Sequence, residues 1–241
     1  MSVRVELQPA YVLHTRSYRD SSLLVELLSR DYGRIAAVAK GAKTGARKRA
    51  GKPLQPFTPI LASWLGKTSL KTLTQREMTK AIPALLGDSL YSGLYINELL
   101  VRVLQHEDPH PGIFDLYHQT LLSLGGDLPV DVSLRYFELG LLEALGYGID
   151  LNLDSEHGEP IFENRDYHYI NEVGLVPVQS SSEKRPGVFR GKDLCQMAAG
   201  QYSEEARLCA KRLLRQALAP LIGDKPLNSR SLFEQYRKVS K

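Results

Sequence analysis

The sequence has few cysteines and no long apolar run. Its 241 residues include only 2 cysteines, Cys195 and Cys209, which are too few for a disulfide framework. No apolar stretch approaches the roughly 20 residues that a membrane-spanning helix needs. The residues after Met1 lack the apolar core of a signal peptide. We therefore expect a cytoplasmic protein that does not enter a membrane.

The motifs of nucleotide hydrolysis, metal binding and nucleophilic catalysis are also missing. Residues 45–52 resemble a phosphate-binding P-loop, but five residues separate the glycines instead of four, and Pro53 stands where Ser or Thr is required. The six histidines and two cysteines show no HxxH, HExxH or CxxC spacing, and Gly-x-Ser-x-Gly is absent. We predict that the protein is not an enzyme and has no catalytic residue, metal or cofactor.

Acidic residues are absent between Tyr32 and Arg76. Residues 1–80 carry 15 Lys and Arg against 5 Asp and Glu, which gives a net charge of +10. Residues 81–204 carry 7 against 19, and residues 205–241 carry 9 against 3. Nucleic acid is a dense line of negative charge, so we expect the first segment to attract it and the second to repel it.

The basic residues within this acid-free stretch are the predicted nucleic-acid contacts. They are Arg34, Lys40, Lys43, Arg47, Lys48, Arg49, Lys52, Lys67, Lys71 and Arg76. A loop at residues 41–52 that is merely solvated is the alternative, but the stretch without acids also covers the flanking predicted strands. The interleaved aromatic residues are candidates for stacking on unpaired bases, although we expect Phe57 and Trp64 to belong to the core.

Short strands followed by helices are predicted, which makes the protein α+β. Apolar or alternating runs predict strands at residues 10–16, 22–30, 33–40, 56–65 and 70–78. Residues 31–33 form the expected turn between the second strand and the third. Five short strands suit an N-terminal five-stranded OB-fold barrel at residues 1–80, with an SH3-like barrel as the alternative.

Helical periodicity begins after Pro83 and predicts an α-helical domain at residues 81–241. Helices are expected at residues 89–106, 112–124, 131–145, 191–199, 204–219 and around 229–237. Asp131 is the expected N-cap of the third helix, and Gly146 is the expected residue after its C-cap. A small β-hairpin, at residues 167–170 and 174–178, is expected to interrupt the helices.

Arg135 lies on the third predicted helix, close to Phe137 and Leu141. A cation beside an apolar groove suits the capture of an acidic, hydrophobic peptide end. The alternative is an ordinary surface salt bridge with Glu138 or Glu143, and the pattern alone favours that alternative.

Several strings of residues stand out in order along nearly the whole chain. They occupy residues 38–42, 54–59, 90–100, 135–139, 145–148 and 225–230. Together they resemble the bacterial RecO family of recombination mediators. The resemblance implies an OB-fold, a helical C-terminal domain, binding to single- and double-stranded DNA, and annealing of complementary strands. It also implies partnership with RecR, contact with the C-terminal tail of single-stranded-DNA-binding protein, indirect help to RecA in the RecF pathway, and association with the nucleoid.

The same resemblance assigns Arg135, with Leu139 and Leu142, to the surface that holds the acidic tail. Some members of the family carry a four-cysteine zinc ribbon between the helices. Residues 152–178 contain no cysteine, so we predict a hairpin remnant without metal ligands. An RNA-binding OB-fold protein and a protein scaffold are the alternatives that charge alone does not separate from a DNA-binding protein.

Overall fold

The structure is a computed structural model that describes residues 4–42, 53–178 and 187–239. Contacts along the chain divide it into two compact units, residues 1–127 with 225–241 and residues 128–224. Within the described residues, the first unit contains a barrel and three helices, and the second contains three helices and a small sheet. The predicted domain boundary between residues 80 and 81 lies inside the first unit and stays a prediction.

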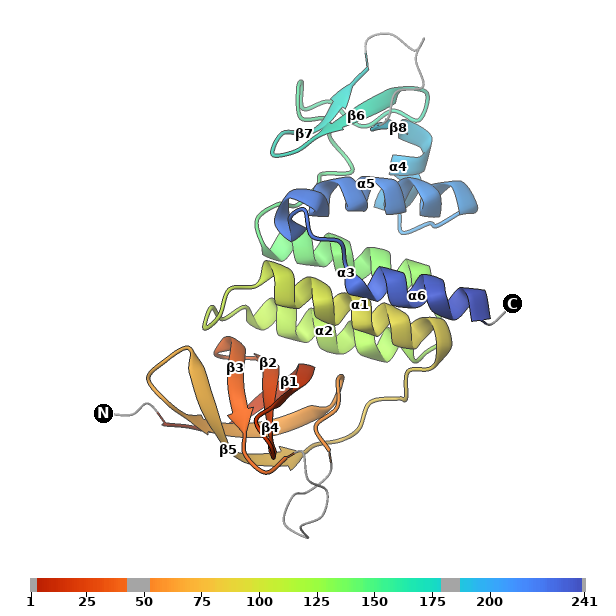
Figure 1. The fold of residues 1–241 in the computed structure, drawn as a ribbon. Helices are drawn as coiled ribbons and strands as arrows, with labels where there is room; N and C mark the ends of the chain where they lie inside the picture. Colours follow the sequence, from red (N-terminus) through yellow and green to blue (C-terminus); the bar gives the residue numbers. More distant parts are fainter. Residues whose placement is uncertain (1–3, 43–52, 179–186, 240–241) are drawn as a thin grey trace. The chain divides into compact units, whose positions relative to one another are not determined.

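Five strands form a closed barrel in the first unit (Figure 1). They are β1 (Arg4–Tyr18), β2 (Ser22–Ser29), β3 (Gly33–Ala39), β4 (Pro59–Leu65) and β5 (Leu70–Met78). Their order is β1-β2-β3-β5-β4, in which β3 and β5 run parallel and all other neighbours run antiparallel. The predicted five-stranded OB-fold barrel is confirmed, rather than the SH3-like alternative.

The barrel core comes from alternate residues of each strand. Val25, Ile35 and Trp64 expose 2% or less of their surface. Phe57 is half-buried against the first helix, where a Cβ atom added at Gly93 would lie 2.9 Å from its ring. Trp64 therefore belongs to the core as expected, whereas Phe57 is only half-buried, against a helix.

The first strand begins six residues earlier than the predicted one, at Arg4 instead of residue 10. Its pairing with β4 shifts register between Val5 and Gln8, and Leu7 has a φ of 48°. A bulge of this kind interrupts the strict alternation of side chains. Residues 3–8 nevertheless alternate between apolar and polar side chains in the sequence, so a signal for the first part of the strand was present and was missed.

A buried polar network joins the barrel to the helices α1 (Gly87–Val103) and α2 (Pro111–Leu124). The side-chain amide of Asn97 donates to the carbonyl oxygen of Leu13 at 2.7 Å. The Tyr117 hydroxyl donates to Oδ1 of Asn97, also at 2.7 Å. Tyr11 on β1 forms a hydrogen bond with His118 on α2. Because buried polar groups are costly without partners, this network fixes how the barrel and both helices pack.

Glu98 on α1 holds the start of α6 (Asn228–Val239), the last helix of the first unit. Its carboxylate accepts the backbone N–H groups of Asn228 and Ser229 at 2.9 Å and 2.8 Å. Arg102 donates to the same carboxylate at 3.2 Å. The first N–H groups of a helix have no partner within the helix, so the carboxylate supplies one.

Replacing Glu98 with Gln is expected to loosen α6 at neutral pH. Burial alone would raise the pKa of Glu98, but the N–H groups of Ser229 and Asn228 and the charge of Arg102 lower it below 4.5. The stabilisation is therefore present above pH 4.5 and is lost as the pH falls through the pKa of the folded protein. We expect about 1–2 kcal/mol at pH 7.

Hydrogen exchange of the α6 amides measures this effect. The variant should exchange faster than the parent protein at pH 7, and the difference should shrink under acidic conditions. Glu234→Gln, at an exposed position of the same helix, is the matched control. Equal protection of α6 in both proteins at pH 7 would contradict the role given to Glu98.

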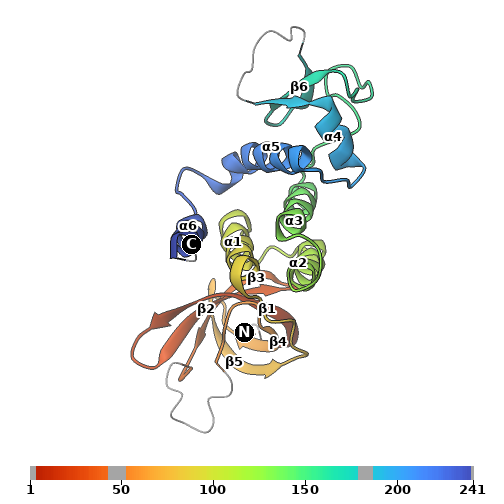
Figure 2. The ribbon, with the colours of Figure 1, turned by 90° about the vertical axis from the view of Figure 1, so that its right-hand side faces the viewer.

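The second unit places α5 (Glu204–Ile222) between α3 (Val130–Ala144) on one side and a small sheet with α4 (Gly191–Ala198) on the other (Figure 2). The sheet contains β6 (Asp166–Ile170), β7 (Gly174–Pro177) and β8 (Val188–Arg190), in the order β7-β6-β8. The predicted hairpin is therefore present, with one strand added. That strand has only three residues, too few to show an alternating pattern.

Two predictions from the sequence concern the residues at the ends of α3. The N-cap is Pro129, so the prediction that Asp131 caps the helix is wrong. Asp131 lies in the first turn instead, where its charge faces the positive end of the helix dipole and an Arg207 guanidinium 3.7 Å away. Gly146 has a φ of 81° directly after the C-cap Leu145, as expected for a glycine at that position.

Hydrogen bonds to Asp154 shape the turn that precedes the small sheet. Its carboxylate accepts the N–H groups of Glu156 and His157 at 3.0 Å and 2.6 Å. Within the described ranges, no group of three or more His, Cys, Asp and Glu side chains is arranged to hold a metal ion. Helices long and apolar enough to cross a membrane are likewise absent from the described residues.

Candidate nucleic-acid interface

The ten predicted nucleic-acid contacts fall into two sets. Lys43, Arg47, Lys48, Arg49 and Lys52 lie outside the described residues. The other five lie on the barrel strands or in the segments that immediately follow them, and are Arg34, Lys40, Lys67, Lys71 and Arg76.

Two of these cations are already paired inside the first unit. Nη1 of Arg34 lies 3.1 Å from Oε2 of Glu26, and its Nε donates to the carbonyl oxygen of Leu104 at 3.0 Å. The ammonium group of Lys71 lies 2.8 Å from Oε2 of Glu107, and its side chain is only 7% exposed. These contacts tie the barrel to the segment after α1. We therefore leave Arg34 and Lys71 out of the interface proposed below.

Lys40 is exposed, and the strand register brings two further arginines to it. Arg16 and Tyr18 point to the same face of β1, because side chains alternate along a strand. Tyr18 pairs with Ser22 on β2, and Leu23 pairs with Ala39 on β3. Lys40 directly follows Ala39, so it lies close to Leu23 and to Ser22 before it. Arg19 follows in the β1–β2 turn, so four neighbouring positions carry three cations and one aromatic ring.

We call Arg16, Arg19 and Lys40 the basic corner. All three side chains are exposed. Among the described residues, none of them forms an ion pair with a carboxylate, in contrast to Arg34 and Lys71. Exposed cations without internal partners are the groups that can exchange counterions for phosphates.

Sequence reasoning missed Arg16 and Arg19. Both lie outside the acid-free stretch, which begins after Asp31, and Asp20 follows Arg19 directly. The signal that would have found them is the predicted pairing of the first strand with the second and the second with the third. That pairing brings positions 16 to 19 next to position 40.

The end of β1 that carries Arg4 differs from the basic corner in how its charges are paired. Lys67 lies in the turn after β4, whose last residue Leu65 pairs with Arg4. Arg4 lies 2.7 Å from Glu6, and Arg30 lies 3.1 Å from Asp115. Lys67 is exposed, and Arg4 at this end is paired with Glu6. Lys40 follows Ala39, which pairs with Leu73, whereas Lys67 precedes Leu70, which pairs with Ala36, so the two lysines lie towards opposite ends of the paired part of β3 and β5.

Arg76 is half-buried on β5, where it pairs with Ala62 on β4. Burial lowers the pKa of its guanidinium, which nevertheless stays charged at neutral pH. The structure therefore does not place Arg76 with Lys40 as an exposed cation.

Arg135 is buried in an ion pair instead of standing free at the surface. Its Nη1 lies 2.9 Å from Oε2 of Glu138, and the side chains are 9% and 3% exposed. Tyr202 lies near this pair, and burial together with Tyr136 raises the pKa of its hydroxyl to about 12. The alternative of a salt bridge with Glu138 is the arrangement observed, although it is buried and not at the surface.

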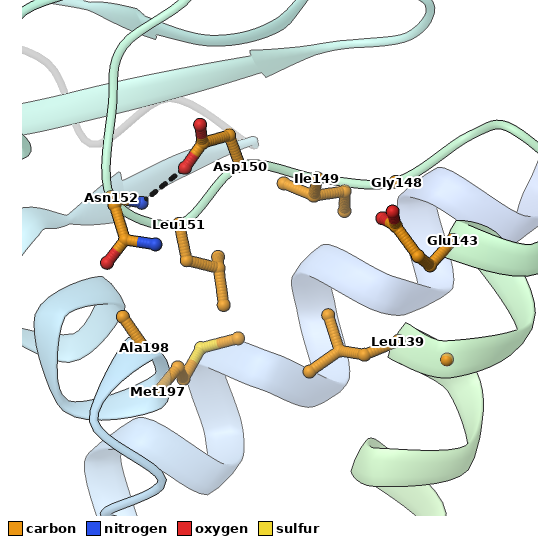
Figure 3. A pocket seen from close by; sticks show the side chains of 10 residues that line it. Leu139, Glu143, Gly148, Ile149, Asp150, Leu151, Asn152, Met197 and Ala198 are labelled. Carbon is orange, nitrogen blue, oxygen red and sulfur yellow. Dashed lines mark hydrogen bonds between the residues drawn. The ribbon is translucent and has the colours of Figure 1, made fainter.

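A pocket of about 570 Å³ opens beside α3 in the second unit (Figure 3). Leu139, Leu151 and Met197 line its apolar part, and Glu143 and Asp150 supply carboxylates. None of its lining residues is basic, and Arg135 is not among them. The pocket therefore does not favour an acidic ligand. Leu142, the third residue predicted for the tail, has no exposed surface.

Comparison with known proteins decides which family these two units represent. The family model "Recombination protein O N terminal" matches residues 1–82, and "Recombination protein O C terminal" matches residues 87–231. The chain belongs to the RecO family. The DNA repair protein RecO of Haemophilus influenzae is 44% identical over 232 residues, which cover 95% of this chain and 96% of that protein. RecO proteins of Alkalilimnicola ehrlichii and Pseudomonas aeruginosa are 45% and 46% identical, over 98% and 94% of this chain and 94% of each relative.

Membership of the RecO family gives the chain a role in DNA repair and recombination. The resemblance drawn from the short sequence strings is thereby confirmed. DNA is accordingly the nucleic acid for which the basic corner is considered, and the RNA-binding alternative receives no support.

Proposed function

We propose that the protein binds single- and double-stranded DNA through the basic corner and anneals complementary strands. The observation that carries this proposal is the gathering of Arg16, Arg19 and Lys40 on neighbouring strands without acidic partners in the described chain. The remaining acid-free residues, Lys43, Arg47, Lys48, Arg49 and Lys52, stay predicted contacts outside the described range. Lys67 and Arg76 were predicted as contacts as well, but we leave them out of the proposed surface because the geometry does not join them to the basic corner.

Annealing on this surface requires no bond to be made or broken in the DNA backbone. Two complementary strands repel each other through their phosphates, and cations that neutralise several phosphates reduce that repulsion. A surface of exposed side chains holds each strand without enclosing it, so bases remain able to pair. We propose on this basis that the protein acts without a catalytic residue, a metal or a cofactor.

An annealing assay with two labelled complementary oligonucleotides tests the proposal. The parent protein should accelerate pairing, and the variant with Arg16, Arg19 and Lys40 changed to alanine should lose most of that acceleration. The matched control removes three positive charges from outside the basic corner by changing Arg4, Arg30 and Lys67 to alanine. Equal acceleration by the two variants would overturn the proposed function of the basic corner.

Protein partners belong to the same proposal. We propose contact with the acidic C-terminal tail of single-stranded-DNA-binding protein, partnership with RecR, and assistance to RecA loading in the RecF pathway. For the tail, Arg135 and Leu139 are the candidate contacts, and Leu142 is left out because it is fully buried. Since Glu138 already pairs with Arg135, a tail carboxylate has to take the place of Glu138. The cytoplasmic, nucleoid-associated location stays a prediction.

Changing Arg135 to Gln together with Glu138 to Gln is expected to reduce tail binding by about tenfold. The double change removes the receiving cation without leaving its partner as an unpaired buried charge, and a charge-assisted hydrogen bond contributes about 1.5–3 kcal/mol. Fluorescence anisotropy with a labelled tail peptide measures the affinity. Arg207→Gln, which removes an exposed ion pair with Asp131, is the control. Unchanged affinity in the double variant would remove Arg135 from the tail site.

A further inference from the structure

The barrel contains five aromatic residues, and the structure separates their environments. They are Tyr11, Tyr18, Tyr32, Phe57 and Trp64. Tyr11 and Trp64 expose 3% and 2% of their surface, and Phe57 packs against α1. Tyr11 and Trp64 therefore have no open face on which a nucleotide base can stack, and Phe57 is half-buried against α1.

Tyr32 is exposed but lies away from the basic corner. Its ring stands edge-on to Trp64, with ring centroids 5.4 Å apart, in the β2–β3 turn. That turn lies at the end of the barrel where Arg4 and Arg30 are paired with Glu6 and Asp115. A DNA strand held by phosphate contacts at the basic corner does not need to reach this end.

Tyr18 is the remaining ring, and it lies within the basic corner. It is the last residue of β1, on the same face as Arg16, and β2 lies between it and Lys40, which follows β3. The ring is partly exposed. The guanidinium carbon of Arg19 lies 5.3 Å from the centre of the ring, at the distance of a cation–π contact.

Arg19 is the first residue of the turn between β1 and β2, and its φ of 52° is the left-handed conformation that such turns commonly contain. The guanidinium lies over the neighbouring Tyr18 ring in this conformation.

We infer that Tyr18 is the residue on which an unpaired DNA base stacks, while Arg19 moves from the ring to the adjoining phosphate. This inference rests on the proposed function, because it assigns an unpaired base to the same surface. Stacking requires an open base face, which a single strand offers and the interior of a duplex does not. Tyr18 therefore makes the basic corner prefer single-stranded DNA, while the cations serve both forms.

Binding of Tyr18→Ala to a labelled oligothymidine, and to a duplex of the same length, tests the inference across a range of salt concentrations. We expect affinity for the single strand to fall by about fivefold or more, which corresponds to loss of one stacked base. The slope of affinity against salt should stay at the parent value, because no phosphate contact is lost. Duplex affinity should stay unchanged, and Tyr18→Phe should bind like the parent protein.

Two controls separate stacking from other effects. Tyr32→Ala removes a partly exposed tyrosine at the opposite end and should leave both affinities unchanged. Tyr18→Leu keeps apolar bulk at the strand end, and it replaces the alanine variant if that variant does not fold. The inference is overturned if loss of the ring weakens single-strand and duplex binding equally, or if it has no more effect than Tyr32→Ala. Normal binding by Tyr18→Ala beside weakened binding by the basic-corner variant would refute the stacking role alone, whereas normal binding by both would refute the proposed function.

Discussion

Changing Arg16, Arg19 and Lys40 together to alanine is expected to lower affinity for single-stranded DNA by about 100-fold near 0.1 M salt. Each phosphate contact on a single strand contributes about 0.7 to the slope of log affinity against log salt concentration. Loss of three contacts therefore lowers the slope by about 2. Between about 1 M and 0.1 M salt, this change corresponds to a difference in affinity of about two powers of ten. The three side chains are exposed and leave no buried partner behind, so the fold should be retained.

Titrations at several salt concentrations measure both the affinity and the slope. The variant of Arg4, Arg30 and Lys67 has the same change in net charge and should keep most of the parent slope. The comparison is informative because general attraction to a positive protein would affect both variants equally. A parent-like slope in the basic-corner variant would show that the strand does not lie there.

Replacing Asn97 with Leu is expected to lower the free energy of unfolding by about 2–4 kcal/mol. Asn97 donates to the carbonyl oxygen of Leu13 and accepts from the hydroxyl of Tyr117, and it is only 3% exposed. An apolar side chain leaves both groups buried without these partners, and each costs about 1–3 kcal/mol. Because the network connects β1 with α1 and α2, the loss affects the packing of the barrel on its helices.

Denaturant unfolding measures this change, with Asn171→Leu at an exposed position as the control. Tyr117→Phe removes one member of the same network and should cost less. The two changes should combine to less than their sum, since both remove the same hydrogen bond. A strictly additive pair would show that Asn97 and Tyr117 do not depend on each other for stability.

The sequence predicted the elements that are short apolar runs between turn residues or helices with an apolar stripe. The hairpin of β2 and β3 is such a pair of largely buried runs, and α1 has such a stripe. The start of β1 was missed although residues 3–8 alternate in the sequence, and β8 has only three residues. Both depend on pairing with residues far along the chain, which a local pattern does not contain.

The candidate site was predicted only in part, for a similar reason. A count of charges identified the barrel as basic, and it included Lys40. It also included Lys71, whose partner Glu107 lies 36 residues away and enters only through the fold. The charge count missed Arg19 because the adjacent Asp20 carries the opposite charge, although the fold brings Arg19 close to Lys40. The ion pair of Arg135 with Glu138 spans a single helical turn, and local spacing was enough to suggest it.

Lysine reactivity with and without a DNA strand tests the central claim most directly. Acetylation in the presence of an oligothymidine, followed by mass spectrometry, reports the protection of individual lysines. We predict that the strand protects Lys40 and leaves Lys67 as reactive as in the free protein. Lys71 should react slowly in both cases, because it is buried and paired with Glu107. Protection of Lys67 with no protection of Lys40 would contradict the location of the DNA site at the basic corner.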